Sequence, residues 1–332
     1  MGTQVFLAGC AVGMPLALGG AWLASLPAVL LAAWIAGRCT SALAFSGQNA
    51  PKSRLCYLLL CTALLLSGAV AAASMVCFAG QTLIEQTRGI STAALTAAAA
   101  ALCALSGGTG VHRLCFALRY ALPAALLGLS LSAMPMRIPA GLFPILGAGA
   151  PQLGMAAMGM LFAAAPALML ALPPPEITLA GDAAQACAIP EKRFFVRRML
   201  VGALTGAVLL FLSCAAATYE SIQESTQWGA RLSIAAGTSA HEGVLQMLLT
   251  LSKLLAMLLL AANMLCAAEQ ALVLAFPALS QRRMGLALLL LALFICLAAL
   301  IILGERLLLL LAPGIVVPAA LAAVLAGRRR RT

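Results

Sequence analysis

Ten long apolar runs, separated by short polar stretches, constrain the fold of this chain more than any other feature of its sequence. A helix that crosses a lipid bilayer needs about 20 predominantly apolar residues, and ten segments meet or approach this length. We predict membrane-spanning helices at residues 4–18, 21–37, 55–80, 90–106, 114–136, 153–172, 199–219, 243–278, 284–303 and 307–326. The eighth run, at about 36 residues, is long enough to extend beyond the hydrocarbon or to bend.

The overall composition excludes most classes of soluble protein. Of the 332 residues, 64% are hydrophobic and 9% are charged, whereas a soluble domain has about 25% charged residues. Too few polar side chains are present to cover a water-facing surface, so we exclude a soluble enzyme, a nucleic-acid-binding protein and a disordered tail. The 11 cysteines include no C-x-x-C pair, so we expect neither a disulfide framework nor a metal site.

The basic residues outside the apolar runs give the orientation of the spans. Cytoplasmic loops of membrane proteins are enriched in Lys and Arg. If the N-terminus is cytoplasmic, fifteen basic residues fall in inner loops and four in outer loops. We therefore predict an all-α polytopic protein with ten spans, both termini in the cytoplasm, and a basic cytoplasmic tail at 327–332. The chain is one membrane domain over 1–332.

Ten spans divide into two sets of five, residues 4–136 and 153–326. Because five is odd, the second set enters the membrane from the opposite side, which is the geometry of an inverted repeat. The first span of each set is interrupted by Gly or Pro, and such breaks free backbone groups that line a cavity. A kink or a packing role is the alternative. The predicted ligand-binding residues are Gly9, Gly13, Met14, Pro15, Phe162, Ala163 and Pro166.

Three polar residues lie within the eighth span: Lys253, Asn263 and Glu269. Polar and charged residues at membrane depth are functional candidates by default. Lys253 and Glu269 are too far apart along a helix to pair, at roughly 24 Å. Lys253 is a candidate for coupling to a cation or proton, or it snorkels to the outer surface. We expect Glu269 to snorkel or to pair with a cytoplasmic Arg.

Signatures of membrane enzymes are missing from the sequence. It contains no H-E-x-x-H, G-x-S-x-G or P-loop motif, and its one Asp is Asp182. We therefore expect neither an enzyme nor a cofactor. The apolar, Gly- and Pro-rich loop at 137–152 precedes the broken sixth span, where we expect either a lid or a short interfacial helix.

Several short stretches together resemble one known family. They are GGAWLASLPAVLL before and within the second span, GGTGVHRLCFALRYALPAALLGL around the fifth, RIPAGLFPILGAGAPQL after it, and HEGVLQMLLTLSKLL at the eighth. These stretches are similar to the B subunits of spore germination receptors. The residues that carry the likeness are Trp22, Gly110, Arg113, Pro144, Gly147 and Glu242.

The resemblance implies a member of the amino acid–polyamine–organocation superfamily with a LeuT-like five-plus-five fold. Such a subunit recognises a small nutrient germinant, commonly an amino acid. It works with A and C subunits in the spore inner membrane and binds no nucleic acid. Two alternatives remain from the residues themselves. One is a proton- or cation-coupled amino acid permease, and the other is a ligand-free membrane scaffold or channel subunit.

Overall fold

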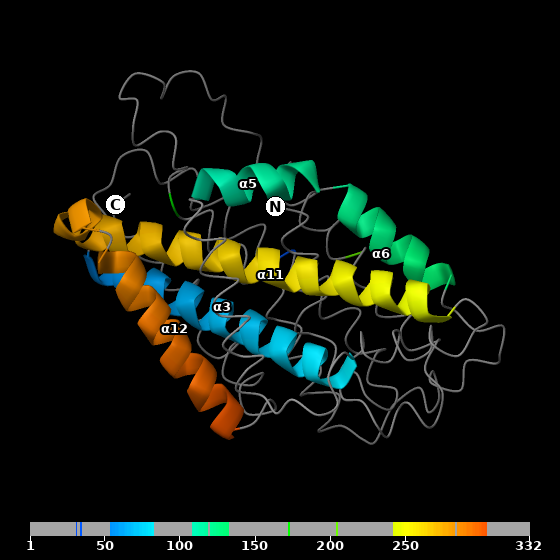
Figure 1. The fold of residues 1–332 in the computed structure, drawn as a ribbon. Coiled ribbons are helices and arrows are strands. Elements are labelled where there is room, and N and C mark those ends of the chain that lie inside the picture. The colour runs from blue at the N-terminus through cyan, green and yellow to red at the C-terminus, as the bar shows by residue number, and fades with distance from the viewer. Residues whose placement is uncertain are drawn as a thin grey trace, which may run out of the picture.

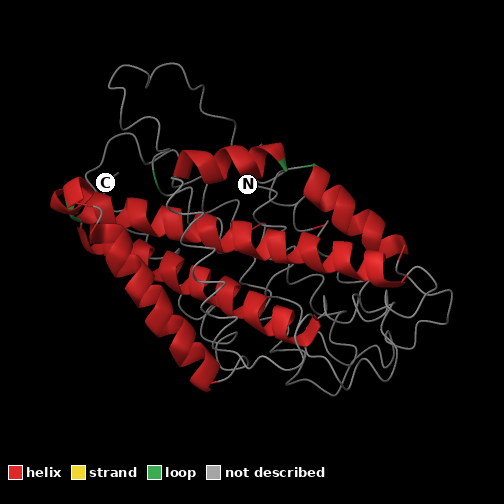
Figure 2. Cartoon of the chain, in the orientation of Figure 1, coloured by secondary structure: helices red, strands yellow, loops and turns green. Residues whose placement is uncertain are grey.

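The computed structural model describes residues 31, 34, 54–82, 108–118, 120–132, 172, 204, 242–282 and 284–303. Among these residues the structure is helical, and no strand occurs (Figures 1 and 2). The predicted all-α class therefore holds for the described part of the chain. The helices are α3 (Arg54–Thr82), α5 (Gly108–Ala117), α6 (Ala121–Ser132), α11 (Glu242–Ala275), the 3-10 helix η5 (Pro277–Arg282) and α12 (Met284–Leu303).

Three helices coincide with apolar runs that the sequence predicts to be helical. Helix α3 matches the run 55–80, α11 matches 243–278, and α12 has the same bounds as 284–303. The eighth run ends three residues early, where Phe276 leaves α11 and Pro277 begins η5. Pro has no N–H to donate, so it cannot continue the ladder of the preceding turn.

Within the described residues, one helical segment is long and apolar enough to cross a membrane, by length and composition. It is Leu254–Ala275 of α11, and a shorter apolar segment is Tyr57–Ala69 of α3. The 34 residues of α11 correspond to a length of about 50 Å, which exceeds the roughly 30 Å of bilayer hydrocarbon. Helix α11 is therefore long enough to extend beyond the hydrocarbon, one of the two outcomes expected for this run.

The predicted span at 114–136 is bent in the part that the structure describes. Two helices, α5 and α6, meet at a bend at residues 118–120 (Figure 1). Backbone hydrogen bonds continue through the bend: the N–H of Leu118 donates to the carbonyl of Leu114, and that of Leu122 to the carbonyl of Leu118, both at 3.0 Å. Pro123, in the first turn of α6, lacks an N–H for the next bond of the ladder, and a helix commonly bends where such a bond is missing.

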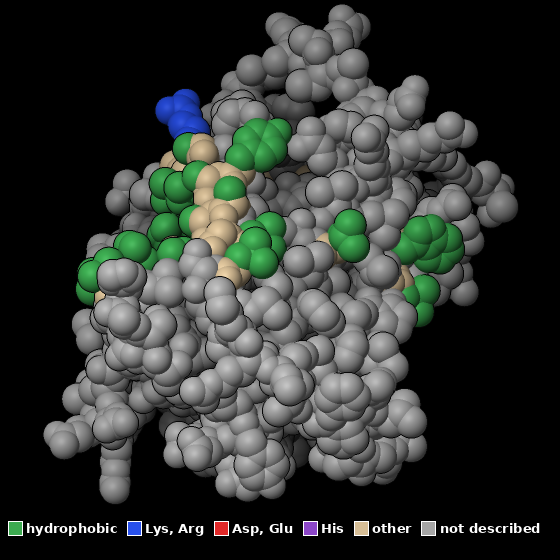
Figure 3. All heavy atoms as spheres, turned by 90° about the vertical axis from the view of Figure 1, so that its right-hand side faces the viewer, with side chains coloured by type: hydrophobic (Ala, Val, Ile, Leu, Met, Phe, Trp, Pro, Cys, Tyr) green, Lys and Arg blue, Asp and Glu red, His purple; other side chains and the backbone are tan. Residues whose placement is uncertain are grey.

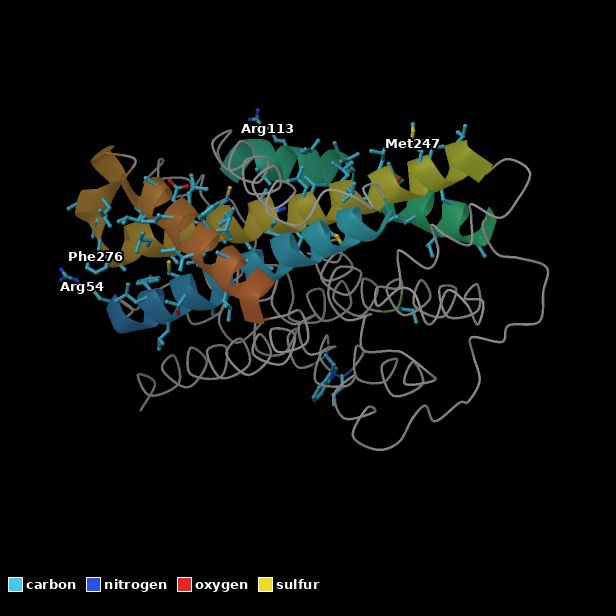
Figure 4. The ribbon with its side chains drawn as sticks, turned by 60° about the horizontal axis from the view of Figure 1, so that its bottom comes forward. Arg54, Arg113, Met247 and Phe276 are labelled. Atoms are coloured by element: carbon cyan, nitrogen blue, oxygen red, sulfur yellow. The ribbon has the colours of Figure 1, made fainter. Side chains whose placement is uncertain are left out.

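Helices α3 and α11 form the core. They run side by side in opposite directions along most of their length, and α5, α6 and α12 pack around them (Figures 1 and 4). The middle of α11 is buried on nearly every side from Ala256 to Ala268, as expected for a helix that is apolar all round. Alanine and leucine together make up most of this core. The buried alanines are Ala63, Ala69, Ala71, Ala72, Ala256, Ala261, Ala262, Ala267, Ala268, Ala271 and Ala275.

Large apolar side chains also lie on the outside of the bundle. On the first turns of α11 they occur at spacings of three and four residues, at Val244, Met247, Leu248 and Leu251. The outward stripe of α12 comprises Leu288, Leu291, Phe294 and Ile295. In Figure 3 the described side chains on one face of the molecule are mainly hydrophobic, with a basic side chain at the edge. An apolar surface of this kind is unfavourable in water and marks an interaction with lipid or with another protein.

Candidate functional site

Helices α3 and α11 lie in close contact at Gly68. A Cβ atom added there would lie 3.3 Å from the Cβ of Met264, 3.7 Å from the carbonyl oxygen of Ala261 and 3.8 Å from Cγ of Leu265. Small residues allow helix backbones to approach closely, which is a common basis of helix pairing in membranes. Gly68 therefore sets the separation of the two core helices.

Ser67, beside Gly68, is fully buried and donates a hydrogen bond from its Oγ to the carbonyl oxygen of Ala63 at 2.7 Å. A buried hydroxyl without a partner is costly, and this bond within the same helix satisfies the donor. The sequence analysis did not single out Ser67 or Gly68. The signal for them is the run of small residues at helical spacing, Ser67, Gly68, Ala71 and Ala72.

Asn263 is the other polar residue among the buried residues described, with 1% of its surface exposed. Its Nδ2 donates to the carbonyl oxygen of Leu259 at 2.7 Å. The donor is thereby held within α11, in the part of that helix that is buried on nearly every side. The structure thus places a polar side chain deep in the centre of the helical core.

The two charged residues predicted in the eighth span lie on the same helix. Glu269 is half-buried on α11, six residues beyond Asn263 and inside the membrane-length segment. Lys253 also lies on α11, immediately before that segment. Because α11 is one continuous helix, Lys253 and Glu269 are separated by roughly 24 Å along its axis. The structure therefore brings the three polar residues onto one helix without bringing the two charges together.

The family-motif residues Gly110 and Arg113 lie in helix α5. This helix begins at Gly108, six residues before the predicted start of the fifth span. The side chain of Arg113 is exposed and points away from α11 (Figure 4). Glu242 is the first residue of α11, at the helix end where a carboxylate is electrostatically favoured.

The remaining predicted site residues lie outside the described part of the chain, so their placement stays a prediction. They are Gly9, Gly13, Met14, Pro15, Trp22, Pro144, Gly147, Phe162, Ala163 and Pro166. The loop at 137–152 lies outside it as well.

Among the residues that the structure describes, no three His, Cys, Asp or Glu side chains are grouped so that they could hold a metal ion. Cys61 and Cys266 lie on α3 and α11 as thiols outside any disulfide, where cysteine packs as a small apolar residue.

No protein-family model matches the sequence, and no curated protein matches it significantly.

Proposed function

We propose that this chain is a ten-span membrane protein with an inverted five-plus-five repeat of the LeuT-like type. It binds a small nutrient, an amino acid in the first instance, at the broken first helices of the two halves. In this proposal it acts as the ligand-recognising subunit of a germination receptor, together with A and C subunits in the spore inner membrane.

The observation that carries the fold proposal is the pairing of α3 with α11. By the predicted span count these are the third helix of the first half and the third helix of the second half. Equivalent helices of an inverted repeat are related by a two-fold axis in the membrane plane, so they run in opposite directions. Helices α3 and α11 run in opposite directions and meet closely at Gly68 (Figure 1), which supports a pseudo-two-fold axis between them.

The distribution of side-chain sizes supports the membrane placement. At Gly68 the contact of α3 with α11 uses a residue without a side chain, and on α12 leucine, isoleucine and phenylalanine side chains are exposed. In lipid there is no hydrophobic force to drive large apolar residues inward, and small residues at the interfaces give the closest packing.

The resemblance to germination receptor B subunits supports recognition of a nutrient rather than an enzymatic role. Among the described residues, Asn263 supplies a polar group at the centre of the core. The half-buried Glu269 supplies a carboxyl two turns further along α11. Polar groups in these positions suit a protein that handles a polar solute at membrane depth.

Thermal unfolding of the purified full-length protein, with each of the twenty amino acids in turn, tests the proposal. A ligand at 100 times its Kd stabilises the folded state by about 2.7 kcal/mol, so the correct amino acid raises Tm. We expect Gly13→Leu and Pro166→Leu to abolish this shift. Leu291→Ala, on the outward stripe of α12, is the control that keeps it.

Three results separate the proposal from its alternatives. If none of the amino acids raises Tm, the ligand-binding proposal fails and the scaffold or channel alternative stands. If the bound amino acid is also accumulated by proteoliposomes along a proton or cation gradient, the permease alternative replaces the sensor. Binding without accumulation supports the sensor.

A further inference from the structure

Helix α3 begins and helix α11 ends at the same end of the bundle, at a surface that we call the basic corner. Gly68 on α3 faces Met264 on α11, and the two helices run in opposite directions (Figure 1). Counted from this contact, Arg54 is 14 residues back along α3 and Phe276 is 12 residues on along α11. Both therefore lie about 18–21 Å from the contact, at nearly the same level. In Figure 4 the two side chains project next to each other from this end.

The surface of the basic corner combines exposed apolar residues with basic ones. Phe276 is 39% exposed, although it directly follows the membrane-length segment that ends at Ala275. The N–H of Leu279 donates to the carbonyl oxygen of Phe276 at 3.0 Å, and η5 packs on both α11 and α12. The chain is thus held against the bundle as it turns the corner. The basic corner comprises Arg54, Phe276, Pro277, Ala278, Leu279 and Arg282, the last residue of η5.

The positive charge of the basic corner is not offset by the acidic residues of the described part of the chain. Those acidic residues are Glu242 and Glu269. Glu242 begins α11, at the opposite end of that helix. Glu269 lies seven residues before Phe276, roughly 10 Å further into the bundle. In the sequence a further Lys or Arg lies within two residues of both Arg54 and Arg282. The basic corner therefore favours a ligand with negative charge.

The level of the basic corner identifies the chemistry of that ligand. Because the membrane-length segment ends at Ala275, the proposed membrane placement puts Phe276 and η5 where the hydrocarbon meets the lipid headgroups. The predicted spans agree with this level, since Arg54 precedes the third span and Arg282 lies between the eighth and the ninth. At such a boundary a guanidinium reaches the phosphate layer and an aromatic ring stays with the acyl chains. Basic surfaces at the cytoplasmic ends of membrane helices bind anionic headgroups.

We propose that the basic corner binds an anionic phospholipid of the cytoplasmic leaflet. Arg54 and Arg282 supply the positive charge for its phosphate, and Phe276 contacts its acyl chain. The proposal rests on the membrane placement proposed above but not on the nutrient ligand. A free phosphate ion would use the same charges but would leave Phe276 exposed to water, so the apolar part of the basic corner favours a lipid.

The test places a fluorescent reporter at the basic corner itself. Full-length protein carrying Phe276→Trp, which keeps an aromatic ring at this position, is reconstituted in phosphatidylcholine vesicles. A small share of the lipid is dibrominated phosphatidylglycerol or dibrominated phosphatidylcholine, and quenching of the added tryptophan is measured after the signal of the parent protein is subtracted. We expect the brominated phosphatidylglycerol to quench at the lower share. Each basic residue near the surface gives about a fivefold preference for anionic lipid. Arg54→Gln and Arg282→Gln should therefore each lower the preference about fivefold, and the double variant should abolish it.

Arg113→Gln is the matched control, because Arg113 is also exposed and basic but lies on α5, away from the basic corner (Figure 4). It should leave the preference unchanged, and an equal loss in this variant would show a general surface charge instead of a site. Equal quenching by the two lipids, or an unchanged preference in Arg54→Gln, overturns the proposal. Loss of the preference when inorganic phosphate replaces chloride at equal ionic strength also overturns it and assigns the site to a free anion. If neither lipid quenches the reporter, the membrane placement fails together with the proposal. A ligand-induced Tm shift of the wild type is independent of all these results.

Discussion

Gly68 offers the most direct test of the packing between α3 and α11. Replacing it with leucine puts a side chain where a Cβ alone would lie 3.3 Å from Met264 Cβ and 3.7 Å from the Ala261 carbonyl oxygen. Neither atom is the free end of a flexible side chain, so relief requires the two helices to separate. Overpacking of this kind costs up to about 3 kcal/mol. The better helix propensity of leucine over glycine returns about 1 kcal/mol, so we expect Gly68→Leu to destabilise the protein by about 2 kcal/mol.

Gly128→Leu is the matched control for this prediction, since a Cβ there meets nothing within 4 Å. Gly128→Leu gains helix propensity without crowding a neighbouring helix. The free energy of unfolding of this variant should therefore be equal to that of the wild type or higher. Both variants are measured by titrating the purified protein in mixed micelles with dodecyl sulfate and following helix content by circular dichroism. If Gly68→Leu is as stable as Gly128→Leu, the close contact of α3 with α11 is refuted.

Three further changes test other parts of the fold by the same titration or by a distance measurement. On α12, Leu293→Ala should lower the free energy of unfolding by about 2–5 kcal/mol, because Leu293 is 1% exposed. Leu291 is 57% exposed, so Leu291→Ala should stay within about 0.5 kcal/mol of the wild type. Equal losses in the two variants would contradict the burial of Leu293 and the exposure of Leu291. Asn263→Asp, which places a charge at a 1% exposed position, should cost about 3 kcal/mol, and a loss below about 1 kcal/mol would show that the site admits water. Pro123→Ala restores a backbone donor and should straighten the bend, so spin labels on α5 and α6 move apart; an unchanged separation would show that packing on α11 holds the bend.

The apolar runs alone located three of the helices, because a backbone surrounded by apolar side chains satisfies its polar groups most simply within a helix. The run 284–303 has the bounds of α12, and 55–80 differs from α3 by one residue at one end and two at the other. The run at 114–136 did not predict the bend between α5 and α6, because a hydropathy pattern does not register the missing N–H of Pro123. The helix also begins earlier than the run, at Gly108.

The candidate site also contains some residues that the sequence identified and others that it did not. Asn263, Glu269 and Lys253 were found as polar interruptions in an apolar run, and the structure places all three on α11. Ser67 and Gly68 were missed, because small residues are frequent throughout this chain and their helical spacing on α3 has meaning only once a partner helix is known.

The sequence by itself determined that this chain is helical and apolar, and where its longest helices begin and end, because both follow from local composition. Only the tertiary structure decided which sides of those helices meet. Helix α12 is apolar on every side, so no amphipathic pattern distinguishes the buried Leu293 from the exposed Leu291. The pairing of α3 with α11 is likewise decided by shape, through the absent side chain of Gly68 opposite Met264. In a bundle this apolar, steric fit replaces hydrophobic contrast as the property that selects helix partners.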